Sequence, residues 1–142
     1  RSLELSDVPL FIEGNNDFTV DALAGLAGAL STRVRIADSR QRMRLHLAAV
    51  FACNFANHLF ELGGEVLRRA GVSADLLRPL IAETTAKALA AARPAAVQTG
   101  PAVRGDLPTQ ERHLRLLADD ALLSDIYRLI TQSIWETSRK IS

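Results

Sequence analysis

Residues 38–71 decide the fold, and they read DSRQRMRLHLAAVFACNFANHLFELGGEVLRRAG. Asp38, followed three residues later by Gln41, fits a capping box, in which each side chain satisfies a backbone amide at the start of a helix. After this point the chain has no proline until Pro79. The stretch therefore predicts one long helix from residue 39 to about residue 70, with a length of roughly 45–50 Å.

Glycines mark the second half of this helix. Gly63 and Gly64 are where we expect any bend or interruption, because each glycine costs about 1 kcal/mol in a helix interior. Gly71 suits the left-handed position that commonly follows a helix C-terminus. Ser73 is a good N-cap for a further helix. The long helix is therefore expected to end near residue 70, with another helix starting soon afterwards.

The long helix is apolar on more than one face. A surface helix carries a single apolar stripe, whereas a helix that is apolar nearly all round is buried. We therefore expect this helix to be the central helix of its domain or the core of a dimer. The apolar side chains that cover most of its circumference are Leu45, Leu47, Val50, Phe51, Phe55, Leu59, Phe60 and Leu62.

A strand, a helix and a second strand are predicted before the long helix. Residues 8–12 form a short apolar run that ends at a cluster of turn-forming residues. Residues 19–30 then place apolar side chains at helical spacing, with Asp17 or Thr19 as the N-cap. Residues 34–36 predict the second strand. Two short strands cannot bury their faces alone, so we expect them to pair with strands outside this chain or with a second copy.

Further helices are predicted after the long one, over residues 75–92, 107–118 and 122–140. The fold class is therefore mainly α: a helical bundle around one long central helix, preceded by a short β-α-β remnant of a Rossmann sheet. We divide the chain into the β-α-β piece, residues 1–37, and the helical domain, residues 38–142. The last helix carries one apolar stripe, made of Leu123, Ile126, Ile130 and Ile134.

A seam of polar side chains runs along the otherwise apolar long helix. At the angular spacing of an α-helix, His46 and Asn57 lie within about 20° of one another, as do Asn54 and Glu61. Buried amides and imidazoles cost stability unless they are hydrogen-bonded, so one interpretation is that the seam is satisfied inside the fold. The other is that it faces a ligand cleft, where His46 and Asn54 or Asn57 reach a substrate.

The segment from Thr99 to Asp106 contains two glycines and a proline, which indicates a shaped loop and not a loose linker. Asp106 is well placed to cap the helix that follows, and that structural role alone could explain it. The alternative is a loop that closes over an active site. In that case Arg104 would meet an anionic group of the substrate and Thr99 would donate a hydrogen bond from its hydroxyl.

Composition excludes several classes of protein. Of the 142 residues 48% are hydrophobic, so a core is feasible, and the net charge of +1 gives no basic surface for a nucleic acid. A single cysteine, Cys53, excludes an intramolecular disulfide and favours a reducing cytoplasm. We expect its thiol to be inert packing. No apolar run approaches the roughly 18 residues of a membrane span.

Two further expectations concern metals and the start of the chain. His46 and His58 are twelve positions apart, which does not fit the spacing of common metal sites, so we expect no metal ion. The chain opens Arg1-Ser2-Leu3-Glu4, with neither an initiator methionine nor the apolar region of a signal peptide. We interpret that start as an internal point of a longer protein.

Three segments carry a resemblance to a known family. Residues 45–55 resemble the opening helix of the domain of unknown function 2520. Residues 99–101 together with residues 104–106 resemble the second signature of that family. Residues 11–14 resemble the last sheet region of the Rossmann domain that precedes it there. The resemblance extends over nearly the whole chain.

The resemblance implies a protein that joins an N-terminal dinucleotide-binding Rossmann domain to this helical domain. Its organisation is similar to that of pyrroline-5-carboxylate reductase, ketopantoate reductase and 6-phosphogluconate dehydrogenase. In such enzymes the C-terminal helices build the dimer interface and one wall of the substrate cleft, and NADP is the usual cofactor. No Gly-x-Gly-x-x-Gly motif follows a strand here. We therefore expect NADP or NAD to bind the parent protein outside this chain, and the chain alone to bind no cofactor and to be inactive.

The expected function is that of a helical dimerisation and substrate domain of an NAD(P)-dependent oxidoreductase. The expected partners are a second copy of the chain, bound through the long helix, and an unidentified small-molecule substrate, with no nucleic acid and no membrane. The alternative is a dimerisation module without catalytic activity. The resemblance and the polar seam suggest His46 and Asn54 as catalytic residues, and Asn57, Thr99, Arg104 and Asp106 as substrate-binding residues.

Overall fold

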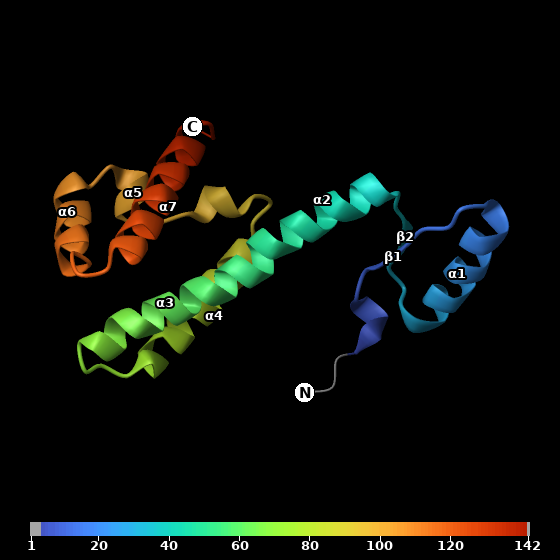
Figure 1. The fold of residues 1–142 in the computed structure, drawn as a ribbon, viewed down its shortest axis with the longest axis horizontal. Helices are drawn as coiled ribbons and strands as arrows, with labels where there is room; N and C mark the ends of the chain where they lie inside the picture. The colour runs from blue at the N-terminus through green and yellow to red at the C-terminus, as the bar shows by residue number, and fades with distance from the viewer. Residues whose placement is uncertain (1–3, 142) are drawn as a thin grey trace. The chain divides into compact units, whose positions relative to one another are not determined.

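Two short parallel strands and the helix between them form the first part of the structure (Figure 1). Strand β1 (Leu10–Ile12) pairs with β2 (Val34–Ile36), with Leu10 opposite Val34. Helix α1 (Asp17–Leu30) connects the strands and packs against both. The predicted strand-helix-strand order is confirmed. The two strands pair with each other, although we had expected each to pair only with strands outside this chain or with a second copy. Pairing of their outer edges with such strands stays a prediction.

The structure is a computed structural model that describes residues 4–141. A short 3₁₀ turn, η1 (Leu5–Asp7), precedes β1. Residues 1–3, on which the expectation of an internal start rests, and residue 142 lie outside the described residues.

Side chains at both ends of α1 fix its position. Its N-cap is Asn16, whose carboxamide oxygen accepts a hydrogen bond from the Thr19 amide at 2.8 Å, and not Asp17 or Thr19 as predicted. At the other end, the buried Ser31 hydroxyl donates to the Val8 carbonyl at 2.5 Å and accepts from the Arg33 amide at 3.0 Å. Ser31 therefore joins the segment before β1 to the segment before β2.

The predicted long helix is present and runs without interruption through three segments: α2 (Ser39–Ala49), a π-helical segment η2 (Val50–Phe55) and α3 (Ala56–Arg69). The capping box is confirmed, because the Asp38 carboxylate accepts from the Gln41 amide at 2.7 Å and the Gln41 side chain accepts from the Asp38 amide at 2.9 Å. The irregularity lies in η2, so the helix departs from α geometry before the two glycines and not at them.

Gly71 ends the long helix as predicted, with a left-handed backbone (φ 70°). The Val72 amide donates to the Leu67 carbonyl at 2.9 Å and the Gly71 amide donates to the Arg68 carbonyl at 3.0 Å, which is the pattern of a Schellman motif. Gly64 has a different role. A Cβ at this position would lie 3.3 Å from the Cβ of Ala74, so glycine allows the chain to approach α3 closely after it turns back.

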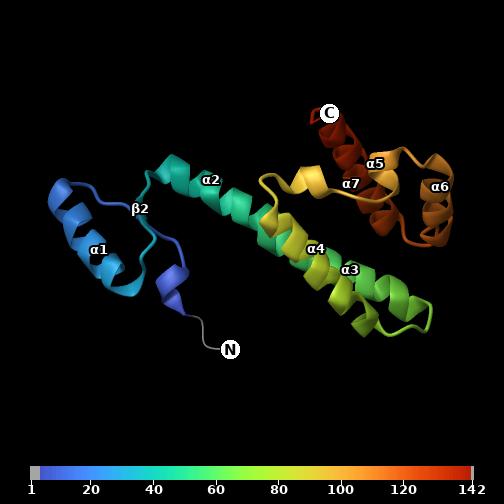
Figure 2. The same ribbon diagram turned by 180° about the vertical axis from the view of Figure 1, so that it is seen from behind.

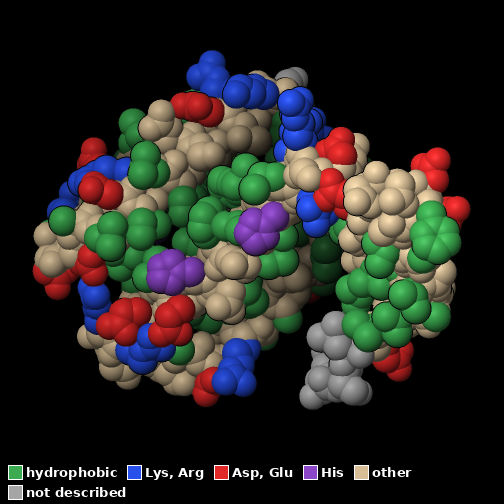
Figure 3. Space-filling model, turned by 45° about the vertical axis from the view of Figure 1, so that its right-hand side comes forward, with side chains coloured by type: hydrophobic (Ala, Val, Ile, Leu, Met, Phe, Trp, Pro, Cys, Tyr) green, Lys and Arg blue, Asp and Glu red, His purple; other side chains and the backbone are tan. Residues whose placement is uncertain are grey.

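The long helix was expected to be the central helix of its domain or the core of a dimer; residues 4–141 do not bury it, and its burial in a dimer stays a prediction. No side chain of α2 or η2 is buried, and Gly64 is the buried residue of α3. Phe51, for example, is 63% exposed. Figure 3 shows that hydrophobic side chains occupy much of the visible surface. The helix does carry several apolar faces, but residues 4–141 of one chain do not supply the elements that would cover them.

The C-terminal part is helical, as predicted. Helices α3 and α4 lie side by side in both views (Figures 1 and 2), and α5 packs against α6 and α7. The predicted third helix is divided into a 3₁₀ turn and an α-helix. The elements are η3 (Ala74–Leu76), α4 (Leu77–Ala90), η4 (Pro94–Val97), α5 (Pro101–Arg104), α6 (Leu107–Leu116) and α7 (Ala121–Arg139).

The described chain divides into two units, residues 4–58 and residues 59–141. The predicted fold class is confirmed: the protein is mainly α, with a small strand-helix-strand start. The predicted division of the chain into a β-α-β piece, residues 1–37, and a helical domain, residues 38–142, stays a prediction. Among residues 4–141, no helix is both long enough and apolar enough to cross a bilayer.

Candidate functional site

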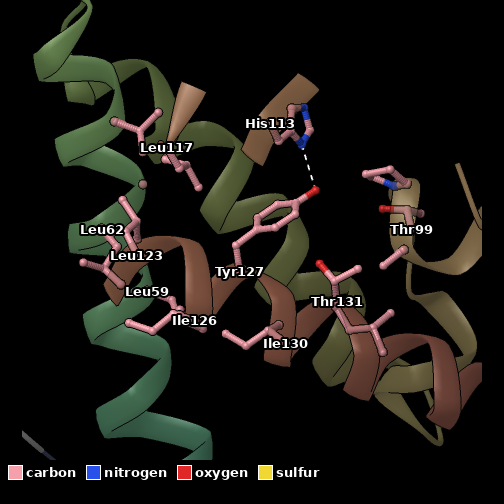
Figure 4. Close-up of a pocket in the computed structure, with 15 residues that line it drawn as sticks. Leu59, Leu62, Thr99, His113, Leu117, Leu123, Ile126, Tyr127, Ile130 and Thr131 are labelled. Carbon is pink, nitrogen blue, oxygen red and sulfur yellow. Dashed lines mark hydrogen bonds between the residues drawn. The ribbon is translucent and has the colours of Figure 1, made fainter. Parts of the chain in front are cut away.

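A groove of about 370 Å³ lies within residues 59–141 (Figure 4). Ligand pockets for small molecules fall at roughly 300–1,000 Å³ and are mostly apolar with a few polar groups, and this groove matches both features. Helices α3 and α7 supply most of its walls, and α5, α6 and the loop before α5 supply the rest. Its apolar lining consists of Leu59, Leu62, Gly63, Val66, Pro101, Ala102, Leu117, Leu123, Ile126, Ile130 and Ile134.

The apolar stripe predicted for the last helix forms one wall of this groove. All four side chains of the stripe line the groove, and Leu123 is 9% exposed while the other three are half-buried. Their spacing of three or four residues places them on one face of α7. The helix starts at Asp120, whose carboxylate caps it by accepting a hydrogen bond from the Leu123 amide at 3.0 Å. The sequence of α7 therefore fixes which face lines the groove.

An ion pair holds the end of α3 against the start of α7. The guanidinium of Arg69 donates to the carboxylate of Asp120 at 2.8 Å and to that of Glu65 at 3.2 Å. Hydrogen bonds from the Leu123 amide and from Arg69 lower the pKa of Asp120, and the same pairing raises the pKa of Arg69. The contact joins the two helices that form the main walls of the groove.

The polar end of the groove is built around a histidine–tyrosine pair. His113 Nδ1, on α6, lies 2.9 Å from the hydroxyl oxygen of Tyr127, on α7, and the two rings meet edge to face with centroids 5.7 Å apart. Both side chains are half-buried. In Figure 4 the ring of Tyr127 lies between an aliphatic cluster on one side and the side chains of Thr99 and Thr131 on the other.

The loop predicted to be shaped does have a defined backbone. Gly100 (φ 108°) and Gly105 (φ 64°) adopt positive φ on either side of the short helix α5. Asp106 caps α6 by accepting a hydrogen bond from the Thr109 amide at 3.1 Å. Hydrogen bonds from Thr109, together with the nearby charge of Arg104, lower the pKa of Asp106. The capping interpretation of Asp106 is thus present in the structure, and its role in substrate binding stays a prediction.

Of the site residues predicted from the sequence, Thr99 lines the groove and the others do not. His46, Asn54 and Asn57 are exposed, on α2, η2 and α3 respectively, and Arg104 is exposed on α5. Among residues 4–141 no other side chain hydrogen-bonds to His46, Asn54 or Asn57, whereas Glu61 of the same seam pairs with Arg68. Their catalytic and binding roles stay predictions.

Sequence reasoning missed the residues that give the groove its polar character. His113, Tyr127 and Thr131 are not among the site residues predicted from the sequence. A signal was available: Tyr127 lies four residues after Leu123 and three before Ile130, so it falls on the apolar face of its helix. A tyrosine on such a face carries a hydroxyl that needs a partner once it is buried.

Comparisons with known proteins agree with the sequence resemblance. The family model for the domain of unknown function 2520 matches residues 8–134. A crystal structure of a "putative NADP oxidoreductase" from Bacteroides fragilis superposes with a TM-score of 0.89 and 43% sequence identity, over 96% of this chain and 52% of that one. The chain thus spans about half the length of that protein. Among curated proteins, none matches this chain significantly. The chain belongs to the domain of unknown function 2520 family.

Proposed function

We propose that this chain is the helical substrate and dimerisation domain of an NADP-dependent oxidoreductase. The observation that carries the proposal is the 43% identity, over 96% of this chain, to about half of a protein named for NADP oxidoreduction. The chain has no Gly-x-Gly-x-x-Gly motif after either strand, so the nucleotide binds residues outside it. The apolar groove supplies part of the substrate cleft.

A second support comes from the surface of the long helix, which suits a homodimer. Leu45, Leu47, Phe51 and Phe55 are 40–63% exposed. The rings of Phe51 and Phe55 already pack edge to face, with centroids 5.1 Å apart. Covering each such side chain contributes roughly 1.5–3 kcal/mol to the free energy of association. A second copy of the chain that covered this face would therefore form a stable dimer.

Nucleotide binding is tested on a protein that carries this chain together with its nucleotide-binding half. NADPH at a hundred times its dissociation constant stabilises the folded state by about 2.7 kcal/mol, so the melting temperature is expected to rise. NADH is the matched comparison, and the 142-residue chain alone, which should show no shift, is the control. An unchanged melting temperature of the two-domain protein with millimolar NADPH and NADH would contradict the oxidoreductase proposal.

Dimerisation through the long helix is tested by light scattering of the chain with Phe51→Glu or Phe55→Glu. Each substitution places a charge in the proposed contact, and the loss of one aromatic side chain should weaken the dimer at least tenfold. Leu89→Glu is the matched control, since Leu89 is 82% exposed on α4. A monomer mass for the unaltered chain at micromolar concentration would refute this part.

The alternative function is a dimerisation module without catalysis, and the exposed apolar helix is the observation that favours it. The two functions differ in one measurement. A dimer that forms through α2 and η2, in a two-domain protein that is not stabilised by NADPH or NADH, would favour the module.

A further inference from the structure

We propose that the groove binds a small uncharged aliphatic carbonyl compound or the corresponding alcohol, with its oxygen at the Tyr127–His113 pair. The binding of such a compound does not depend on the proposed function. That the carbonyl compound and the alcohol are substrate and product does rest on the proposed function. The inference gives a chemical class for the substrate, which neither the name of the family nor that of the related protein states.

The size and chemistry of the groove select the body of the ligand. Eleven aliphatic or small residues, contributed by α3, α5, α7 and the turn before α7, line it. Figure 4 shows leucine and isoleucine side chains gathered on one side of the Tyr127 ring. A chain of several methylene groups lying against these side chains would bind about fourfold more tightly for each methylene it buries. A polar sugar or nucleotide would gain nothing there.

The charge of the lining selects against ionic ligands. Among residues 4–141, no lysine, arginine, aspartate or glutamate lines the groove. Arg104, which we had expected to meet an anionic group, is exposed on α5 and lies outside the lining. A carboxylate or an ammonium group that entered the groove would lose hydration without meeting an opposite fixed charge, which is costly.

The polar end fits one oxygen atom that can change between acceptor and donor. When His113 Nδ1 carries its proton, it donates to the Tyr127 oxygen, and the tyrosine proton is left for a carbonyl oxygen of the ligand. When Nδ1 is unprotonated, Tyr127 donates to it, and the tyrosine oxygen accepts from a ligand hydroxyl. The hydroxyls of Thr99 and Thr131, which both accept and donate, line the same groove.

The test is ligand-observed NMR and calorimetry of the 142-residue chain with four probes of matched length. The probes are methyl pentyl ketone, its alcohol, heptanoate and heptylammonium. The ketone and the alcohol are expected to bind, and the two ions to bind at least tenfold more weakly. Tyr127→Phe, which keeps the ring, should weaken ketone binding about fivefold, the loss of one neutral hydrogen bond.

Two further variants separate a small-molecule site from a protein contact. Ile130→Trp fills the groove and should abolish ketone binding. Leu129→Trp places the same side chain one residue earlier on α7, where Leu129 is 67% exposed, and should leave binding unchanged. Circular dichroism checks that every variant keeps its helices.

The inference would be overturned by no ketone binding to the folded chain, by heptanoate binding as tight as that of the ketone, or by an unaffected Ile130→Trp variant. A lower mass of Ile130→Trp in light scattering, without ketone binding by the unaltered chain, would assign the groove to a contact between copies and would also overturn it. NADPH binding by the two-domain protein is measured separately, so failure of this inference leaves the oxidoreductase proposal standing, and the reverse also holds.

Discussion

Replacing Gly105 by alanine is expected to destabilise residues 59–141 by about 2 kcal/mol. The residue has φ 64°, and an alanine in this left-handed region costs about 1 kcal/mol. A Cβ built there would also lie 3.2 Å from Cζ3 of Trp135, closer than ordinary contact. Because Trp135 is 39% exposed, its ring can move by a few tenths of an ångström. We therefore add only about 1 kcal/mol, the low end for overpacking.

Gly71→Ala is the matched control, because it isolates the backbone cost. Gly71 has φ 70°, and a Cβ added there would meet no atom within 4 Å, so its substitution should cost about 1 kcal/mol. The assay is urea unfolding followed by fluorescence of Trp135, the single tryptophan, which reports on residues 59–141. Equal losses for the two variants would show that the ring contact is irrelevant, and an unchanged midpoint for Gly105→Ala would refute the backbone argument itself.

Further measurements test other contacts. The pKa of Asp120 is lowered, so the stability that this carboxylate contributes is fully present above the unfolded-state pKa and is lost as pH falls through the folded-state pKa. Asp120→Asn keeps a capping oxygen and should make the urea midpoint less dependent on pH in the acid range. An equally steep loss of stability with acid in this variant would contradict the argument. Ser31→Ala removes partners from the Val8 carbonyl and the Arg33 amide and should cost about 1–3 kcal/mol in urea unfolding followed by circular dichroism, unless water replaces the hydroxyl and the cost vanishes. Gly25→Ala, with open space around its Cβ in α1, should raise stability by about 0.5–1 kcal/mol; a lower midpoint would indicate an unseen contact.

Features that depend on neighbouring residues could be predicted from the sequence. The capping box of Asp38 and Gln41, the helix end at Gly71 and the apolar face of α7 each follow from a pattern within a dozen residues. Such patterns act through backbone hydrogen bonds and helical spacing, which do not depend on the rest of the fold.

Features that depend on contacts between distant segments could not be predicted. The pairing of β1 with β2, the joining of α3 to α7 by Arg69 and Asp120, and the meeting of His113 with Tyr127 all require the tertiary fold. The π-helical segment η2 could not be predicted for another reason, because its residue composition does not differ from that of an α-helix. The sequence left two ways to cover the long helix, within its own domain or in a dimer, because apolar residues show that a helix needs to be covered but not which chain covers it.

The two-stranded sheet has a practical consequence for handling the protein. Within the described residues each strand has one neighbouring strand, so the outer edge of each has no partner strand there. Phe11 and Ile36 on these strands are 41% and 67% exposed. Such edges act as templates for strand addition by other molecules. Concentrated preparations of this chain should therefore show colloidal self-association that grows with protein concentration, and a charged residue in place of Ile36 should suppress it while leaving the helices intact.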